Sequence, residues 1–372
     1  MSKVLLIFGT RPEAIKLCPV IRALREHPSR FEVKVCVTAQ HREMLDQVLQ
    51  AFEVHPDHDL DLMRPAQTLS SSTARILAGL EPVMQAERPD VVLVQGDTTT
   101  TFCGALAGFY SGIPVAHVEA GLRTGDLRQP FPEEMNRVVT SRLADLHFAA
   151  TNKAAENLRG EGIPPERICV TGNTGIDAVL FVRDALEHGR LHGRDWPELE
   201  PSKKLIIVTA HRRESFGAGF ERICRALVQL ANREDVQVIY PVHPNPNVQD
   251  PVQRLLGGHR NIRLIEPLSY VPFVDLMRRA YILITDSGGI QEEGPSLGKP
   301  ILVLREKTER PEAVSAGTVK LVGTDERRIV KEAILLLENA EIHERMSRIH
   351  NPYGDGLASG RIADVIHAFL RR

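Results

Sequence analysis

Short runs of aliphatic and β-branched residues alternate with longer segments of helical spacing along most of the chain. In the first half these runs lie at 3–8, 31–39, 90–95, 114–120, 146–150 and 167–172. Segments between them, such as "EAIKLCPVIRALREH", carry apolar residues at the spacing of an amphipathic helix. Strands that are apolar on both faces and joined by crossover helices form a parallel sheet that is covered on both sides. The first half therefore predicts an α/β domain.

The same alternation restarts after a polar stretch at 187–204, with strand-like runs that include "LIIVTA", "VQVIYPV" and "PILVL". A chain of 372 residues is long enough for two domains of ordinary size. We therefore predict two Rossmann-like domains that face a cleft, one at 1–190 and one at 203–356. The last residues, 357–372, have the pattern of an amphipathic helix, which we expect to pack back on the first domain.

Composition excludes several classes of protein. The formal net charge is −2 and 25% of the residues are charged, so a nucleic-acid binder that depends on a basic surface is not expected. The five cysteines are widely spaced and never arranged as C-x-x-C, which predicts neither a disulfide framework nor a zinc site. The apolar run near the N-terminus is too short for a signal peptide or a membrane span. These features predict a cytoplasmic protein without a membrane partner.

The first strand-like run leads into "FGTRPEAIK", in which two cations follow the strand. Ligands of open parallel sheets bind at the carboxyl ends of the strands, so Arg11 and Lys16 are candidate contacts for an anion. Pro12 suits the first turn of a helix, whose positive end would also favour an anion. The alternative is that Arg11 only caps the sheet edge and that Lys16 is solvated.

Three carboxylates are expected near strand ends of the first domain. Asp97 follows a strand in "VQGDTTTT", Glu119 ends another, and Glu133 begins the helix that comes next. Carboxylates that converge on one pocket can act as general acid and general base. An Asp before a run of Thr is also a common helix N-cap, which would explain Asp97 without any chemistry. We expect Glu134 to be the solvated neighbour of Glu133.

The second domain has two histidines that end strands. His211 lies in "VTAHRRESFG" with Arg212 and Arg213 beside it, a cluster that suits a pyrophosphate. His243, in "PVHPNP", can equally be a loop histidine with a structural role. No set of His, Cys and Asp has the spacing of metal ligands, so no metal site is predicted.

The stretch "TDSGGIQEEG" follows another strand of the second domain. It has neither the lysine of a P-loop nor the three glycines of a dinucleotide fingerprint. The hydroxyl of Ser287 and the amides of Gly288 and Gly289 can face a phosphate there. Glu293, one turn into the helix, can accept both hydroxyls of a ribose, and Arg310 can add a cation. The alternative is a glycine turn that serves helix packing only.

Together these motifs closely resemble the non-hydrolysing UDP-N-acetylglucosamine 2-epimerases of bacteria. The resemblance runs nearly end to end, on "FGTRPEAIK", "TAQHREMLDQVL", "GDTTTT", "HVEAGLRTGD", "PEEMNR", "TGNTGIDA", "TAHRRESFG", "DSGGIQEE", "TERPEA" and "NPYGDG". It implies a fold of the glycosyltransferase-B type, usually as a homodimer. It also implies reversible C2 epimerisation of UDP-N-acetylglucosamine (UDP-GlcNAc) to UDP-N-acetylmannosamine (UDP-ManNAc), which supplies N-acetylmannosamine units for cell-surface polysaccharide.

The resemblance also implies roles for particular residues. It places Asp97, Glu119, Glu133 and His211 on the catalytic positions. The implied contacts to the nucleotide sugar are Arg11, Lys16, Ser287, Gly288, Gly289, Glu293 and Arg310, with Leu268 and Phe273 in the loop that holds the uracil. Some bacterial members bind a second UDP-GlcNAc as an activator, near the positions of Gln40, His41, Arg212 and His243.

The chemistry of this substrate narrows the mechanism. The C2 proton has no adjacent carbonyl, so inversion needs either transient oxidation or loss of the anomeric substituent. Oxidation needs NAD, and no G-x-G-x-x-G follows any strand-like run, so no cofactor is predicted. Loss of UDP with the C2 proton gives a 2-acetamidoglucal, and re-addition of UDP with protonation from the other face gives the epimer. A hydrolysing 2-epimerase, a UDP-sugar glycosyltransferase of the same fold and a non-catalytic nucleotide-sugar sensor are the alternatives.

Overall fold

The computed structural model describes residues 1–38, 42–62, 64 and 67–371, and the chain divides into two compact units. Unit 1 comprises Met1–Phe181 and Tyr353–Arg372, and unit 2 comprises Val182–Pro352. Each unit is built on its own parallel sheet, so the predicted fold of two α/β domains is confirmed. The predicted domain limits and the cleft between the domains stay predictions.

Unit 1 has a seven-stranded sheet in the order β3-β2-β1-β4-β5-β6-β7, in which all neighbours are parallel. The strands are β1 (Ser2–Phe8), β2 (Phe31–Val37), β3 (His58–Asp59), β4 (Val91–Gln95), β5 (Val115–Ala120), β6 (Leu146–Ala149) and β7 (Ile168–Val170). The order of strands changes direction between β1 and β4, so the loops after these strands lie at the switch point of the sheet. The sequence does not predict the edge strand β3, because its two residues are polar.

The helices of unit 1 are α1 (Arg11–Arg25), α2 (Arg42–Ala51), α3 (Leu69–Glu87), α4 (Thr99–Tyr110), α5 (Glu133–Leu143), α6 (Asn152–Gly160), α15 (Ala358–Phe369) and the first part of α7 (Thr174–Glu187). Several are preceded by a threonine at the N-cap, because a side-chain oxygen there accepts a hydrogen bond from a backbone N–H that the helix leaves free. Thr10 and Glu13 form a reciprocal capping box at α1, and Thr98 caps α4. These caps set the points at which the chain leaves a strand and enters a helix.

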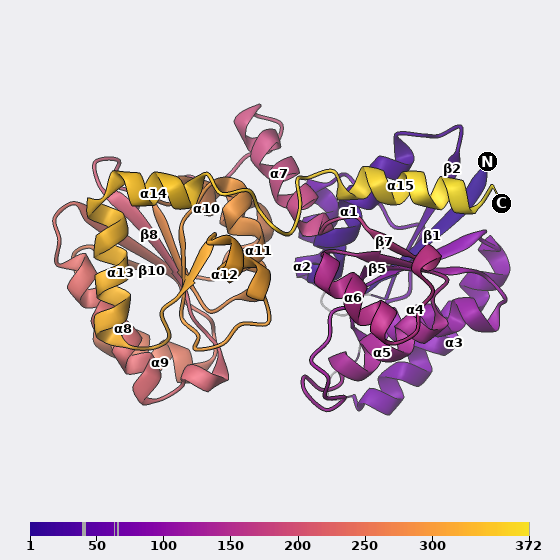
Figure 1. Cartoon of the computed structure of the whole chain (residues 1–372), viewed down its shortest axis with the longest axis horizontal. Coiled ribbons are helices and arrows are strands. Elements are labelled where there is room, and N and C mark those ends of the chain that lie inside the picture. The colour runs from indigo at the N-terminus through magenta and orange to yellow at the C-terminus, as the bar shows by residue number, and fades with distance from the viewer. Residues whose placement is uncertain (39–41, 63, 65–66, 372) are drawn as a thin grey trace. The chain divides into compact units, whose positions relative to one another are not determined.

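The C-terminal helix α15 packs against α1, and Figure 1 shows the two helices together. The start of α15 is held by Asp177 of α7, whose carboxylate accepts hydrogen bonds from the backbone N–H groups of Ala358 (3.3 Å) and Ser359 (2.7 Å). Arg361 of α15 pairs with Asp355 over 2.6 Å. The last segment of the chain therefore belongs to the unit that contains the first segment.

Unit 2 has a six-stranded parallel sheet in the order β10-β9-β8-β11-β12-β13. Its strands are β8 (Lys204–Thr209), β9 (Val236–Pro241), β10 (Ile262–Ile265), β11 (Ile282–Thr285), β12 (Ile301–Val303) and β13 (Val319–Leu321). Its helices are α8 (Ala218–Ala231), α9 (Pro246–Leu256), α10 (Tyr270–Arg279), α11 (Gly288–Glu293), α12 (Pro311–Ala316), α13 (Glu326–Glu338) and α14 (Ala340–Ser347).

The core of unit 2 joins the central strands to the helices that cover them. Ile206 and Val208 of β8 belong to one buried apolar cluster with Phe220 and Leu227 of α8. The order of strands changes direction between β8 and β11, so the loops that follow these strands lie at the switch point of this sheet. None of the helices that the structure describes combines the length and the apolar character that a membrane crossing needs.

Candidate active site

Two of the predicted carboxylates lie at the carboxyl ends of neighbouring strands in unit 1. Asp97 follows β4, Glu119 is the penultimate residue of β5, and β4 pairs with β5. A Cβ atom added to Gly96 would lie 3.7 Å from Glu119 Oε2, so the turn before Asp97 passes close to the Glu119 side chain. Glu133, the third carboxylate, is the first residue of α5 and is half-buried. The sheet thus brings Asp97 and Glu119 to the same edge.

Glu119 has a left-handed backbone, with a φ of 64°, where the pairing of β5 with β6 shifts register. A residue with a Cβ atom adopts this conformation at a cost of about 1–3 kcal/mol. The irregularity re-aims the carboxylate, which forms an ion pair with Lys16 of α1 and accepts a hydrogen bond from Nε2 of Gln95. Lys16 therefore contacts a carboxylate and is not simply solvated.

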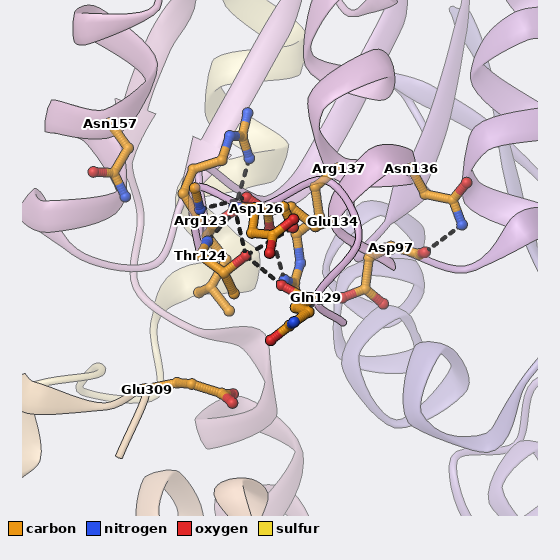
Figure 2. Close-up of polar contacts among 12 residues, drawn as sticks. Asp97, Arg123, Thr124, Asp126, Gln129, Glu134, Asn136, Arg137, Asn157 and Glu309 are labelled. Atoms are coloured by element: carbon orange, nitrogen blue, oxygen red, sulfur yellow. Dashed lines mark hydrogen bonds and ion pairs between the residues drawn. The ribbon is translucent and has the colours of Figure 1, made fainter. Parts of the chain in front are cut away.

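Asp97 is held by α5 through both its side chain and its backbone (Figure 2). Nη2 of Arg137 lies 2.6 Å from Asp97 Oδ2, and Nδ2 of Asn136 donates to the Asp97 carbonyl oxygen over 2.8 Å. Burial disfavours the charge on Arg137, but the Asp97 and Glu134 carboxylates raise the pKa of the guanidinium above its ordinary value. The alternative that Asp97 is only a helix cap is wrong, because Thr98 caps α4.

Glu134 is not the solvated neighbour of Glu133 that the sequence predicts. Its side chain is 1% exposed, and its Oε1 accepts hydrogen bonds from the backbone N–H groups of Thr124 (2.9 Å) and Gly125 (3.1 Å). Oε2 lies 3.0 Å from Nη1 of Arg137. Figure 2 includes both side chains. The prediction fails because the loop between β5 and α5 folds back over the first turn of the helix, which a linear pattern does not reveal.

Glu13 is a buried carboxylate that the sequence analysis missed. Its Oε2 accepts hydrogen bonds from the backbone N–H groups of Gly9 (3.1 Å) and Thr10 (2.7 Å). Its Oε1 accepts from the hydroxyls of Thr98 (2.7 Å) and Thr101 (3.1 Å). Burial raises the pKa of Glu13, and these donors oppose the rise. Glu13 thus ties the loop after β1 to the loop after β4, and the capping-box pattern "TRPE" is the signal that could have revealed it.

The loop that carries Asp97 is also held from the next strand. His117 of β5 is fully buried, and its Nε2 lies 2.7 Å from the carbonyl oxygen of Gly96. Since a carbonyl oxygen only accepts, Nε2 carries the proton in this contact. Burial lowers the pKa of His117 to about 3, so the ring is neutral near pH 7.

In unit 2 the predicted His211 is organised by a buried aspartate that the sequence analysis did not single out. Asp286 Oδ2 accepts hydrogen bonds from the backbone N–H groups of His211 (2.6 Å) and Arg212 (2.7 Å). Nδ1 of His211 lies 3.5 Å from Asp286 Oδ1, and its ring stacks on His243 with 5.3 Å between centroids. Burial lowers the pKa of His211 against the attraction of Asp286. The loops after β8 and β11 are thereby joined.

The glycine stretch after β11 lies against a cation. A Cβ atom added to Gly288 would lie 2.4 Å from Arg310 Cζ, so any side chain at this position would displace the guanidinium. Nε of Arg310 donates to Glu292 Oε1 over 2.7 Å. A Cβ atom added to Gly289 would have Glu293 Oε1 at 3.8 Å and Ser287 Oγ at 4.0 Å. The structure therefore gathers Arg310 and Glu293 around the glycine turn.

The remaining predicted residues lie on loops and helix starts. Arg11 is the first residue of α1 and is partly buried. Leu268 lies between β10 and α10, and Phe273 lies on α10; both are partly buried. The predicted activator contacts Gln40 and His41 lie outside the described residues. Within the described part of the chain, no group of three His, Cys, Asp or Glu side chains could hold a metal ion.

The two parallel α/β sheets place the chain in a broad structural class, the glycosyltransferase-B type of fold. The structure matches the glycotransferase of kitacinnamycin with a TM-score of 0.65 over 99% of each chain at 13% identity, a likeness that shows the glycosyltransferase-B type of fold alone. A model of the family described as UDP-N-acetylglucosamine 2-epimerase matches residues 22–367. The chain belongs to this family.

Relatives of known name match the chain over almost its whole length. The UDP-N-acetylglucosamine 2-epimerase of Salmonella typhimurium is 58% identical over 372 residues, which cover 99% of each chain. The crystal structure of UDP-GlcNAc 2-epimerase from Neisseria meningitidis bound to UDP-GlcNAc is 50% identical and has a TM-score of 0.89, with 98% of this chain and 99% of that chain covered. The predicted resemblance to this family is confirmed.

Proposed function

We propose that this protein is an isomerase that interconverts UDP-GlcNAc and UDP-ManNAc by elimination and re-addition of UDP. The observation that carries the proposal is the pair of carboxylates, Asp97 and Glu119, at adjoining strand ends, each with a cationic partner. The names of the relatives and the UDP-GlcNAc bound to the Neisseria protein support the choice of substrate.

Unit 1 supplies the groups that exchange protons with C2 of the sugar. Asp97, Glu119 and Glu133 are the acid and base candidates, because inversion requires removal of a proton from one face and its return to the other. Arg11 and Lys16 come from the loop and helix after β1 and are positive groups for the diphosphate.

Unit 2 supplies the groups that hold UDP while it is detached from the sugar. His211 and the amides of the glycine turn stabilise charge on the departing pyrophosphate, as preorganised donors do for a developing anion. Arg310 adds a positive charge beside Gly288, and Glu293, near Gly289, is the acceptor proposed for the ribose hydroxyls. Leu268 and Phe273 are the contacts proposed for the uracil.

Incubation of the protein with UDP-GlcNAc alone tests the reaction type. Interconversion with UDP-ManNAc, followed by NMR, supports the epimerase. Accumulation of free UDP and N-acetylmannosamine identifies a hydrolysing enzyme, and an unchanged substrate identifies a glycosyltransferase or a sensor. Either of the last two results contradicts the proposal.

Isotopes test the elimination step. The C2 hydrogen leaves as a proton, so product formed in heavy water should carry deuterium at C2. Cleavage of the C1–O bond frees the β-phosphate to rotate, so an ¹⁸O label in the bridging position should scramble into the non-bridging positions. C2 deuteration at full turnover without scrambling would exclude a UDP intermediate that is free to rotate.

We further propose a homodimer. Phe109 and Tyr110, at the end of α4, are 58% and 75% exposed, and they adjoin a groove that residues of α3 and α4 line. A second copy of the chain would remove these aromatic rings from water. Sedimentation equilibrium of the wild type and of Tyr110→Glu tests this surface, and a monomeric wild type contradicts it.

A cytoplasmic location and an activating second molecule of UDP-GlcNAc complete the proposal. All five cysteines are free thiols, which suits a reducing compartment. The effector contacts proposed in unit 2 are Arg212 and His243, beside His211. Epimerisation that starts from UDP-ManNAc alone should accelerate when a trace of UDP-GlcNAc is added; a rate that is indifferent to this addition argues against activation.

A further inference from the structure

Four of the first five residues of α5 belong to the proposed catalytic apparatus or hold its loops. Glu133 is a catalytic candidate, Glu134 binds the preceding loop, Asn136 binds the Asp97 backbone and Arg137 binds the Asp97 side chain. One helix end therefore controls both the position of Asp97 and the position of Glu133. Of this set only Glu133 has so far been given a part in the reaction, and Arg137 is the member that contacts the side chain of a catalytic candidate.

The guanidinium of Arg137 lies between two carboxylates and uses a different nitrogen for each. Nη2 lies 2.6 Å from Asp97 Oδ2, and Nη1 lies 3.0 Å from Glu134 Oε2 (Figure 2). The planar fork of an arginine suits such a bridge, whereas the ammonium of a lysine is a single point of charge. The side chains of Arg137 and Glu134 are 12% and 1% exposed, so solvent screens their contact only weakly.

The backbone at Asp97 has supports that do not involve Arg137. Asn136 binds the Asp97 carbonyl oxygen, and His117 binds the carbonyl oxygen of Gly96. The hydroxyl of Thr98, the next residue, donates a hydrogen bond to Glu13 Oε1 over 2.7 Å. Removal of the Arg137 guanidinium should therefore release the carboxylate of Asp97 while the loop stays in place.

We propose that Arg137 is a positioning residue for the reaction, whose guanidinium, itself fixed by the buried Glu134, holds the carboxylate of Asp97 in its working orientation. This inference rests on the proposed function and goes beyond it, because it gives the reaction a residue that touches a catalytic candidate and not the substrate. Glu133 lies four residues before Arg137, on the same face of α5, so the bridge attaches Asp97 to the helix turn that carries Glu133.

The main test compares Arg137→Met with Arg142→Met, which alters an exposed arginine on the same helix. A displacement of the Asp97 carboxylate by about 1 Å is expected to lower kcat of Arg137→Met about 100-fold. KM for UDP-GlcNAc and the Kd of UDP should stay close to the wild-type values, because in this proposal Arg137 does not contact the substrate. Arg142→Met should leave kcat and KM unchanged.

Two further variants separate positioning from a general structural effect. Arg137→Lys keeps the charge but cannot bridge both carboxylates, so its kcat should lie between those of the wild type and Arg137→Met. Arg137→Ala leaves a space, and added guanidinium chloride at a non-denaturing concentration should restore part of its kcat where sodium chloride does not. A loss of fold would not be repaired in this way.

Glu134→Gln keeps the inference testable if the arginine variants fail to fold. The amide oxygen still accepts from Thr124 and Gly125, but the negative charge beside Arg137 is lost. Its kcat alone should fall about 10-fold with KM unchanged, and a wild-type kcat would contradict the inference. Where Arg137→Met folds, the two losses should not add in the double variant, as expected for groups that act as one unit.

Three further results would overturn the inference. The first is a kcat of Arg137→Met equal to that of Arg142→Met. The second is a rise in KM and in the Kd of UDP by the same factor as the fall in kcat, which would make Arg137 a substrate contact. The third is full additivity between Glu134→Gln and Arg137→Met. A wild-type protein that does not act on UDP-GlcNAc at all would instead overturn the proposed function, and this inference with it.

Discussion

The two units secure the loops that carry their catalytic candidates by the same device, but with side chains of different chemistry. In unit 1, Nε2 of His117 donates to the carbonyl oxygen of Gly96, directly before Asp97, over 2.7 Å. In unit 2, the hydroxyl of Tyr240 on β9 donates to the carbonyl oxygen of Ala210, directly before His211, over 2.6 Å. In both, a buried side chain on a neighbouring strand holds the last peptide before the functional residue.

The difference between the two donors lies in their titration. Burial lowers the pKa of His117 to about 3 and raises the pKa of Tyr240 well above its ordinary value. Both side chains are therefore neutral donors near pH 7. Below pH 6.5, the ordinary pKa of histidine, protonation of His117 competes with its buried neutral state, whereas the Tyr240 hydroxyl does not titrate. Acid should therefore weaken the contact of His117 with Gly96 before that of Tyr240 with Ala210.

The units also balance the charges of their sites differently. In unit 1 the carboxylates of Asp97 and Glu119 contact the side-chain cations of Arg137 and Lys16. In unit 2 the carboxylate of Asp286 accepts from the backbone N–H groups of His211 and Arg212. Unit 1 thus holds its catalytic candidates through side-chain cations, whereas unit 2 holds the loop of its catalytic candidate, His211, through backbone N–H groups. Substitution of the unit 1 carboxylates should therefore affect turnover most, and substitution of the proposed nucleotide contacts in either unit should affect binding most.

The largest effect is expected for the carboxylates of unit 1. Asp97→Asn, Glu119→Gln and Glu133→Gln should each lower kcat by about 10²–10⁴-fold, because an amide keeps the shape of the acid but cannot exchange a proton. UDP affinity and thermal unfolding should stay close to the wild-type values. Initial rates and calorimetry provide the measurement, with Glu156→Gln on the exposed part of α6 as the control. A variant that turns over like the wild type removes that carboxylate from the catalytic set.

The next effect is the acid sensitivity of unit 1. The pKa of His117 is about 3 in the folded protein and about 6.5 in the unfolded chain, so between these values only the unfolded chain binds the proton. The free energy of unfolding therefore falls as the pH drops from 6.5 toward 3. The loss is about 1.4 kcal/mol per pH unit, or about 2.7 kcal/mol over two units. His117→Gln keeps a donor for Gly96 but does not titrate, so its stability should fall less steeply with acid.

Hydrogen exchange of β5 peptides in urea, measured across this pH range, reports unit 1 separately. His55→Gln alters an exposed histidine of the same unit and should leave the slope of stability against pH as in the wild type. Equal slopes for His117→Gln and the wild type would show that His117 is not the acid-sensitive group.

Nucleotide binding should draw on both units. Arg11→Ala in unit 1 and Glu293→Ala in unit 2 each remove a hydrogen bond to a charged group, which is typically about 1.5–3 kcal/mol, or one to two decades in affinity. Titration calorimetry with UDP measures this loss, and Arg159→Ala on the exposed part of α6 is the control. Unchanged affinity in both variants would refute the placement of the nucleotide.

The smallest effect is expected at the donor of unit 2. Tyr240→Phe removes the hydroxyl that binds the Ala210 carbonyl and should destabilise unit 2 by about 1 kcal/mol, the net value of one hydrogen bond. The loss should not change between pH 7 and acid, in contrast to that at His117. The single tryptophan, Trp196, lies in unit 2, so its fluorescence during urea unfolding reports this unit. A loss of stability in Tyr240→Phe that grows as the pH falls would contradict the proposed difference between the two donors.

Local patterns were sufficient to predict most of the architecture, though not the edge strand β3. Apolar runs that alternate with helical spacing predicted two parallel sheets, because strands buried on both faces admit few polar residues. The same reasoning placed Asp97, Glu119, His211 and the glycine stretch at or directly after strand ends, where polar residues meet the carboxyl edge of a sheet. The family followed from the order of these motifs.

The partners of these side chains were decided by the tertiary structure. Arg137 reaches Asp97 from 40 positions further along the chain, and Asp286 reaches the His211 backbone from 75 positions away. Such contacts depend on which loops the sheet places side by side, and the pattern of one segment contains no information about the other.

Glu134 shows the limit most clearly. Its sequence neighbours suggest a solvated glutamate in the first turn of a helix, yet the loop at 121–132 covers it and uses its carboxylate as an acceptor. The sequence by itself determined which residues stand at strand ends, because apolar periodicity defines where strands end. Which of them are buried, paired and fixed was decided only by the tertiary structure, because burial and pairing arise from segments that are distant in the chain.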